Sequence, residues 1–153
     1  MKNKTIAAWL TLLGGPFGLH RVYLRGRFDT VAAGLTCATL IGLYGIIRAR
    51  NLGIDDQLSW VLIPFLGFTW AGCALYAIVY GLTSTEAWNA KFNPKAFANS
   101  PHGETGRLTV LALIASLFLG STILMASLAF SIQRYFEYST KALAILQTKE
   151  NDA

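Results

Sequence analysis

Four apolar stretches, separated by short polar segments, dominate the hydrophobic pattern of this chain. They cover about residues 5–19, 30–47, 58–82 and 108–132, and none of them contains an acidic residue. A helix needs about 20 apolar residues to cross a bilayer, so the first stretch is short for a span. Lys2 and Lys4 precede it and can snorkel to the membrane surface, and the bilayer can thin locally. The pattern predicts an all-α membrane protein, a bundle of about four transmembrane helices that begins with a hairpin.

A turn rich in glycine and arginine connects the first two stretches. Glycine and proline at 14–16 end the first helix, because proline removes a backbone donor and glycine destabilises a helix interior. Arginine side chains are costly in hydrocarbon, so we expect the turn at the membrane surface. The side chains predicted to contact lipid headgroups there, or to hold the turn, are His20, Arg21, Tyr23, Arg25 and Arg27.

The same turn resembles the signature of a known family. Lys4, an apolar run and then Gly-Gly-Pro-Phe-Gly-Leu-His-Arg-Val-Tyr-Leu at 14–24 are similar to the TM-two domain (two-transmembrane domain, bacterial "NINE protein") family. The similarity covers roughly residues 4–47. It departs from the family pattern at Val22, where an aromatic residue is usual, and at Arg25, where glycine is usual. The resemblance implies a membrane hairpin whose turn faces the cytoplasm, and it implies no particular activity.

The chain divides into a hairpin of residues 1–50 and a second part of residues 51–153. In the connector between them, Asp55 and Asp56 are placed to cap the third helix. Pro64 falls in the first turns of that helix, which it either starts or kinks.

Residues 83–106 form the longest polar loop. Thr83-x-x-Glu86 is the pattern of a capping box, which predicts a short helix that ends before Pro94. Aromatic residues along one edge favour a helix that lies flat at the membrane interface. The alternative is an element that docks a partner or acts as a lid.

Small residues recur every four positions on two of the predicted spans. Such faces let another helix backbone approach closely, which drives helix association in lipid. We expect the two faces to pack, most economically against each other. The residues assigned to them are Gly34, Ala38 and Gly42 on the second span and Ala112, Ser116 and Gly120 on the fourth.

Helical spacing continues past the fourth stretch, without a helix breaker, to about Lys149. The extra residues would carry the helix roughly 25 Å beyond the bilayer. Its apolar edge is expected to bind the membrane surface, a second copy or another protein, and continuity with a span favours protein. The residues of this edge are Tyr135, Phe136, Leu143 and Leu146.

Composition supports a membrane location and restricts the chemistry. Apolar residues make up 54% of the chain and charged residues 14%, a balance that does not cover a soluble globule with polar surface. The net charge is +5, but the basic residues lie beside apolar stretches rather than in a run, which argues against nucleic-acid binding. Cys37 and Cys73 lack partners at metal-ligand spacing. We therefore expect no metal and no cofactor.

Catalytic residues are not indicated either. The two histidines, His20 and His102, lie in turns, and no predicted span contains a histidine or carboxylate that could activate a serine. The sequence favours a non-catalytic accessory or scaffold subunit that binds other membrane proteins. The alternative is a small homo-oligomeric channel or passive permease lined by serine and threonine. In either case we expect an integral protein of a membrane, the bacterial inner membrane by family resemblance.

Four spans would set a definite topology. They place the N-terminus, the connector 48–57 and the C-terminal helix on one side of the membrane. The arginine turn and the loop 83–106 would lie on the other. Lysine and arginine are nearly balanced between these two sets, so charge alone does not orient them.

Overall fold

A computed structural model describes residues 1–95 and 100–151, and this part of the chain is helical with no strand. Its helices are joined by short turns, apart from the longer loop after α5. In chain order the elements are α1 (Lys4–Gly14), the 3-10 turn η1 (Gly15–Phe17), α2 (Leu19–Arg25), α3 (Thr30–Leu52), α4 (Gln57–Leu82), α5 (Thr85–Phe92), the 3-10 turn η2 (Pro101–Gly103) and α6 (Arg107–Asn151).

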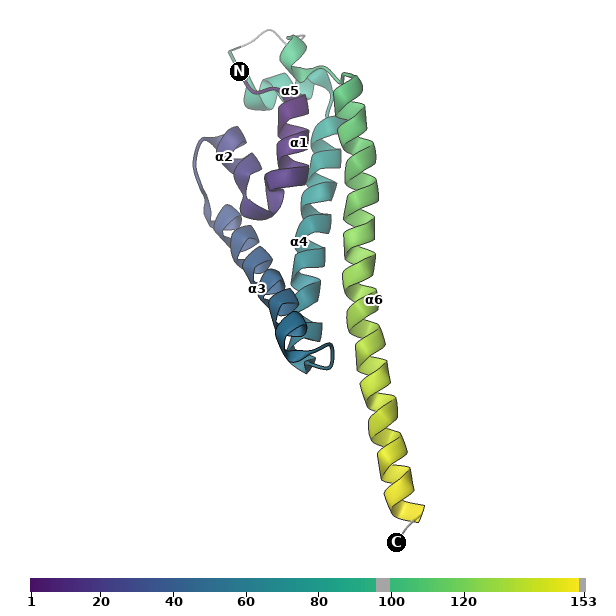
Figure 1. Ribbon diagram of the computed structural model, residues 1–153. Helices are drawn as coiled ribbons and strands as arrows, with labels where there is room; N and C mark the ends of the chain where they lie inside the picture. Colours follow the sequence, from purple (N-terminus) through teal and green to yellow (C-terminus); the bar gives the residue numbers. More distant parts are fainter. Residues whose placement is uncertain (96–99, 152–153) are drawn as a thin grey trace.

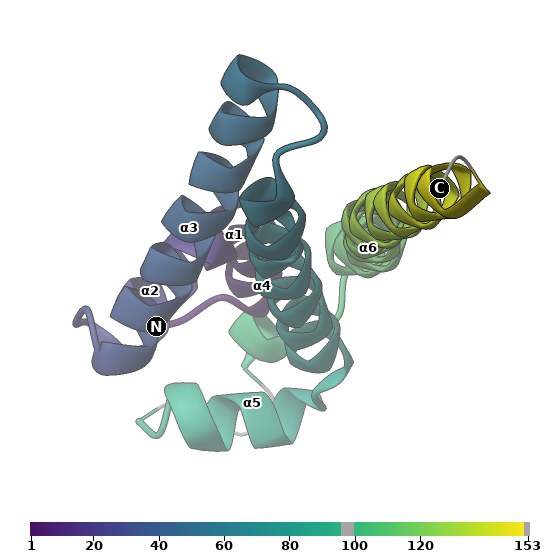
Figure 2. The ribbon, with the colours of Figure 1, turned by 90° about the horizontal axis from the view of Figure 1, so that it is seen from below.

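Three long helices form the body of the molecule, with α4 between α3 and α6 (Figures 1 and 2). Each of the three is long and apolar enough to cross a membrane. The core beside α4 is small, with Leu12 of α1 packed on Ala74 and Ala77. The short helix α5 lies across the end of the bundle where the chain begins (Figure 2).

The first apolar stretch does not form a fourth helix of spanning length. α1 has 11 residues and is about 16 Å long, roughly half the thickness of a hydrocarbon core. The chain then turns at η1 and returns as α2 toward the end from which it came (Figure 1). Residues 1–25 are therefore a short hairpin of two helices laid against α4, and the expected count of about four spans is not confirmed.

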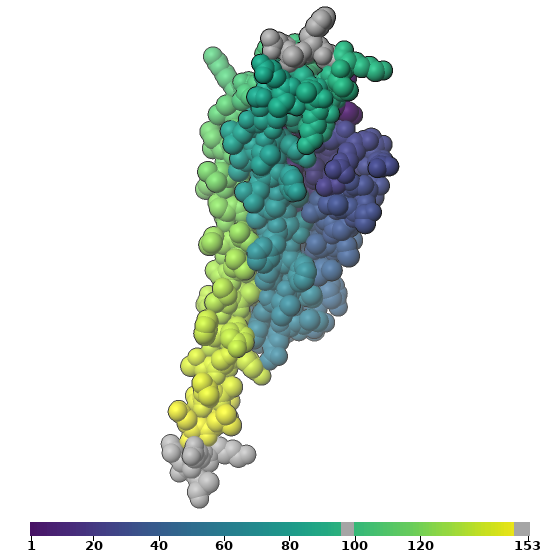
Figure 3. Space-filling model, turned by 180° about the vertical axis from the view of Figure 1, so that it is seen from behind, coloured from purple at the N-terminus to yellow at the C-terminus, as the bar shows by residue number. Residues whose placement is uncertain are grey.

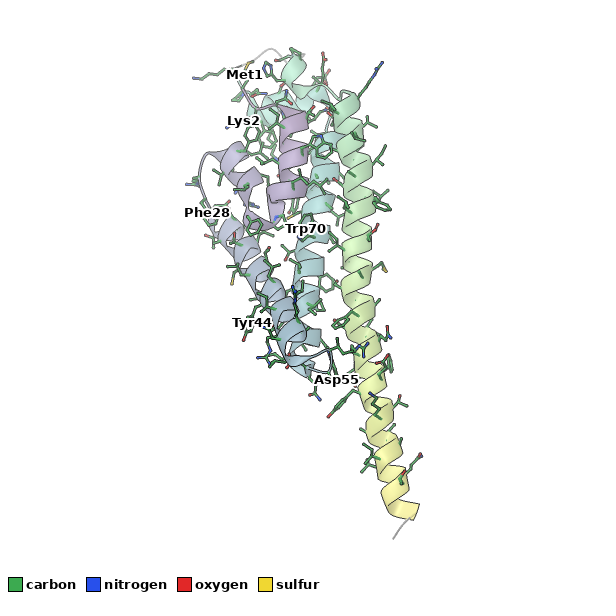
Figure 4. The ribbon with its side chains drawn as sticks, viewed as in Figure 1. Met1, Lys2, Phe28, Tyr44, Asp55 and Trp70 are labelled. Carbon is green, nitrogen blue, oxygen red and sulfur yellow. The ribbon has the colours of Figure 1, made fainter. Side chains whose placement is uncertain are left out.

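This hairpin also changes the expected topology. The backbone of Lys2 is hydrogen-bonded to Asn93, just beyond α5, and the Lys4 ammonium to the carbonyl of Thr83. The N-terminus thus lies at the same end of the bundle as the loop 83–106, not at the opposite end as four spans required. Figure 4 shows Met1 and Lys2 at this end, and Asp55 at the other.

Close backbone approach explains why glycine occupies the turn of the hairpin. A Cβ atom at Gly15 would lie 2.8 Å from the Cβ of Cys73, and one at Gly18 would lie 2.5 Å from the Cβ of Ala32. Gly18 also has φ +72°, a left-handed conformation that favours glycine. The turn backbone is satisfied internally: Gly18 N–H donates to the carbonyl of Gly15 (2.8 Å), and the Thr39 hydroxyl donates to that of Pro16 (2.9 Å).

Local capping signals set the beginnings of the later helices. Asp56 caps α4 by accepting from the N–H of Ser59, as expected for this connector, and Pro64 lies inside α4. The cap of α5 is Ser84, which accepts from Ala87 N–H. The capping box expected from Thr83 and Glu86 is wrong, because the hydroxyl of Thr83 donates to the carbonyl of Val79 in the last turn of α4 and the next residue caps the helix.

Candidate functional site

A cluster of basic side chains lies where α2, α4 and α5 meet. Asp29, in the loop after α2, holds two of them: Arg21 Nη1 and Arg25 Nη1 both donate to its Oδ2, at 2.5 and 2.8 Å. The other oxygen of Asp29 accepts from the N–H of Ala32 at 2.9 Å and so caps α3. The Ala32 N–H first, and then the Arg21 guanidinium, lower the pKa of Asp29, which keeps this carboxylate charged.

Beside this ion pair is a small cavity of about 60 Å³. Its walls combine charge with aromatic surface. The ring of Tyr80 stands edge-on to Phe92, with centroids 6.3 Å apart, and Lys91 Nζ lies 5.4 Å from the Phe92 ring. The lining residues are Arg21, Leu24, Arg25, Tyr80, Lys91 and Phe92. The cavity therefore carries three cations, of which Asp29 neutralises one.

The other residues of the predicted turn have separate roles. The hydroxyl of Tyr23 accepts from Asn3 N–H at 2.9 Å, and Lys2 Nζ lies 5.0 Å from the ring centre. Tyr23 therefore holds the N-terminal segment. Arg27 is exposed in the loop before α3. The five turn residues thus do not form one surface, since only Arg21 and Arg25 share the cavity.

His20 faces the interior of the hairpin. It is 2% exposed, and its Nδ1 atom has no hydrogen-bond partner within the described part of the chain. His20 thus lies inside the protein rather than on the surface of the turn, and its role stays a prediction.

A second polar assembly holds the first residues of the chain beneath α5. Asn93 Oδ1 accepts from Lys2 N–H at 2.6 Å, while Asn93 Nδ2 and Trp88 Nε1 each donate to the Lys2 carbonyl at 3.0 Å. Lys4, expected to snorkel outward, is instead 0% exposed. Its ammonium donates to the Thr83 carbonyl (2.8 Å) and the Thr105 hydroxyl (2.6 Å), and burial lowers its pKa.

Sequence reasoning missed this assembly because its partners are about 80 to 100 positions apart in the chain. The one sequence feature that could have predicted this assembly is a pair of asparagines, one in α5 and one at its C-terminal cap. Asn89 and Asn93 are one helical turn apart, and the amide of Asn93 donates to that of Asn89 at 3.1 Å. A polar pair of this kind, buried on a short helix, indicates that the helix covers backbone groups from elsewhere in the chain.

The two faces of small residues do not meet each other. A Cβ at Gly42 would lie 2.5 Å from the Cβ of Leu66, and one at Gly120 would lie 2.5 Å from that of Ala74. Both faces therefore pack against α4. Ala112 and Ser116 are fully buried as well.

The face of α3 is rotated from the expected one. No atom lies within 4 Å of a Cβ built at Gly34, and Ala38 is only partly buried. The buried residues of this helix are Ala32, Thr39, Gly42 and Gly45.

The far end of α6 forms the third candidate surface. Tyr138 stacks edge-on against Trp60 of α4, with ring centroids 5.8 Å apart, and the helix then continues alone to Asn151 (Figure 1). The predicted apolar edge is fully displayed: its four residues are between 61% and 63% exposed. Ile145, which the sequence prediction did not include, is also exposed. The edge consists of Tyr135, Phe136, Leu143 and Leu146.

The described residues contain no cluster of metal-binding side chains. No three or more histidine, cysteine, aspartate or glutamate side chains gather there as a metal would require. Cys37 is exposed, Cys73 is buried and neither forms a disulfide. The candidate sites therefore consist of ion pairs, buried polar groups and exposed apolar surface.

Comparisons with known proteins identify no relative. No family model matches the chain, and neither a curated protein nor a solved structure matches it. The resemblance to the TM-two domain family stays a prediction, and the function must be inferred from the geometry.

Proposed function

We propose that this chain is an integral membrane protein that crosses the bilayer three times, through α3, α4 and α6. The length and hydropathy of the three helices support this. So does their outer surface, where large apolar side chains such as Leu40, Phe68 and Leu117 are more than half exposed. Apolar surface of this extent is unfavourable in water and favourable in lipid.

In this proposal the α1–η1–α2 hairpin enters the bilayer from one side and returns. Irregular backbone is tolerated at membrane depth only where protein covers it and satisfies its polar groups. The turn meets both conditions, since Gly15 and Pro16 are buried and their carbonyls accept hydrogen bonds from Gly18 and Thr39. Arg21 and Arg25, ending the return helix, then lie toward the headgroups.

The distribution of positive charge orients the protein. The α5 end carries eight of the thirteen lysines and arginines, and the end that bears the tail carries the rest. Under the positive-inside rule the α5 end faces the cytoplasm, and the C-terminal end of α6 lies on the opposite side of the membrane. The family resemblance agrees, and suggests a bacterial inner membrane. The eight residues are Lys2, Lys4, Arg21, Arg25, Arg27, Lys91, Lys95 and Arg107.

Cysteine labelling in intact cells tests this orientation, starting from a variant without Cys37 and Cys73. Asn51→Cys is exposed at the tail end and Gly106→Cys at the α5 end. We expect an impermeant maleimide added outside to label Asn51→Cys only. Labelling of Gly106→Cys alone would reverse the topology, and labelling of both would contradict three spans.

We further propose that the protein is a non-catalytic accessory or scaffold subunit that binds another membrane protein through the end of α6. One observation carries the proposal: α6 runs 45 residues, about 68 Å, and its last turns expose an apolar edge. Beyond Tyr138 the helix extends about 20 Å. An isolated helix of this length is only marginally stable in water. An exposed apolar edge on such a helix therefore argues for a binding surface.

The geometry favours protein over lipid as the binding partner. The tail would have to bend by a large angle to lie flat on a bilayer, yet α6 is continuous and has neither proline nor glycine after Gly120. A rod that stands away from the surface presents its edge to another protein. Figure 3 shows this part of α6 extending clear of the bundle.

Truncation after Ser139 tests the proposal: it removes Leu143 and Leu146 from the apolar edge and keeps Tyr135, Phe136 and the contact of Tyr138 with Trp60. We expect the shortened chain to insert and unfold like the full-length protein, and to lose its partner in cross-linked pull-downs from native membranes. Leu143→Gln with Leu146→Gln should have the same effect without a deletion. The matched control is Thr140→Ala with Thr148→Ala, which changes exposed polar positions on the same helix.

Two outcomes would contradict this function. If the truncated protein keeps every partner of the full-length chain, the tail is only a solvated end. If the full-length protein purifies as a symmetric homo-oligomer whose solute flux is unchanged by truncation, the channel alternative is correct. The hydroxyls of Thr36, Thr69 and Ser121 donate to carbonyls of their own helices, which gives a pore little support.

A further inference from the structure

The cavity between α2, α4 and α5 has the charge of an anion site. Three cations line it, Arg21, Arg25 and Lys91, and no carboxylate is among its lining residues. Asp29 contacts the two arginines but offsets one charge only. The cluster therefore keeps a surplus of positive charge at a place where three elements from distant parts of the sequence meet.

Asp29 also orients the arginines for a further ligand. A guanidinium group has five N–H donors, and Asp29 accepts a single hydrogen bond from each arginine. The ion pair fixes the orientation of both guanidinium groups, so their remaining N–H groups can donate to another ligand. Arg21 is mostly buried, so its charge is only weakly screened by water.

Size and wall chemistry narrow the class of ligand. A cavity of about 60 Å³ suits a group of about the size of a phosphate. Phosphate oxygens match the fork of an arginine. Leu24, Tyr80 and Phe92 supply an apolar and aromatic side to the same cavity, which suits the glycerol and upper acyl carbons attached to a lipid phosphate.

We propose that this cavity binds a phosphate group, which Arg21, Arg25 and Lys91 hold. A phospholipid headgroup and free phosphate in solution share this chemistry. The lipid source rests on the proposed membrane insertion, which places the end of α2 near the headgroups. Such a ligand would link the hairpin to α5, because Arg21 and Arg25 belong to the first and Lys91 to the second.

Native mass spectrometry of the full-length protein in detergent tests the site. The micelles contain equal amounts of phosphatidylglycerol and a galactolipid, which has no phosphate. We expect phosphatidylglycerol to be retained preferentially. Lys91→Gln should reduce this preference by about tenfold, the loss of one charge-assisted hydrogen bond. Lys91 makes no ion pair in the described structure, so the variant keeps the fold.

Arg27→Gln is the matched control. It removes the same charge from the neighbouring loop, but Arg27 does not line the cavity. We expect its lipid preference to stay within about twofold of the wild type. An equal loss in both variants would mean that general surface charge attracts the lipid, and this would overturn the site.

Inorganic phosphate distinguishes the two sources. The site takes free phosphate if inorganic phosphate binds the delipidated protein, if this binding depends on Lys91, and if the protein shows no preference for phosphatidylglycerol. If neither phosphatidylglycerol nor inorganic phosphate depends on Lys91, the proposal is wrong. Carbonate extraction and partner pull-down are measured on the same variants, so a failure of insertion or of the scaffold function is seen separately.

Discussion

The two ends of the molecule are built in opposite ways. At the α5 end, polar side chains from distant segments close on one another: Lys4 on Thr83 and Thr105, and Asn93 on Lys2. At the other end, beyond Tyr138, the described side chains of α6 form hydrogen bonds only within their own helix. One end is closed by tertiary structure, while the other is a single helix with apolar side chains in the open.

This difference separates stability from function. Buried polar groups are costly unless they are paired, so the closed end holds together only when every segment is in place. The open end contributes little to the bundle, and apolar residues there bring no stability to the isolated chain. The partner that we propose would cover these residues and so explain their exposure.

Gly18 lies at the turn of the hairpin whose first residues enter the closed end, and it provides the strongest way to disrupt that hairpin. Gly18→Ala places a Cβ 2.5 Å from that of Ala32 in a backbone with φ +72°. Overpacking and backbone strain together should lower the free energy of unfolding in detergent by about 3 kcal/mol. Gly26→Ala is the matched control, with the same φ and nothing within 4 Å, and should cost about 1 kcal/mol. Equal losses would show that close packing of the turn is unimportant.

Asn93→Ala tests the polar assembly over the N-terminus. It removes both hydrogen bonds to the Lys2 backbone, at 2.6 and 3.0 Å. We expect the free energy of unfolding to fall by about 2 kcal/mol, because an N–H group is left buried without its partner. The comparison is Thr140→Ala on the tail, whose effect should stay within about 0.5 kcal/mol. Chemical unfolding in detergent measures both, and a similar effect at the two sites would remove the contrast.

Features that depend on short stretches of chain were predictable. The apolar runs at 30–47, 58–82 and 108–132 correspond to α3, α4 and α6, and the helical spacing at 133–149 indicated that α6 continues beyond its apolar run. Asp56 caps α4 as its position suggested. These signals work over one or two helical turns, where a side chain meets its own backbone or a neighbour on the same face.

Pairings between distant segments were decided by tertiary structure alone. The four-residue spacing of small residues predicted a packing face on α3 and another on α6. It did not predict that α4 lies between these helices and packs against both. Lys4 and the 5–19 stretch looked like a surface anchor and a span. They fold into a half-length hairpin instead, because Thr83 and Thr105 accept hydrogen bonds from the Lys4 ammonium and Thr39 satisfies the turn. A helix face or a buried ammonium has many possible partners of similar energy, and only simultaneous packing of all segments selects one.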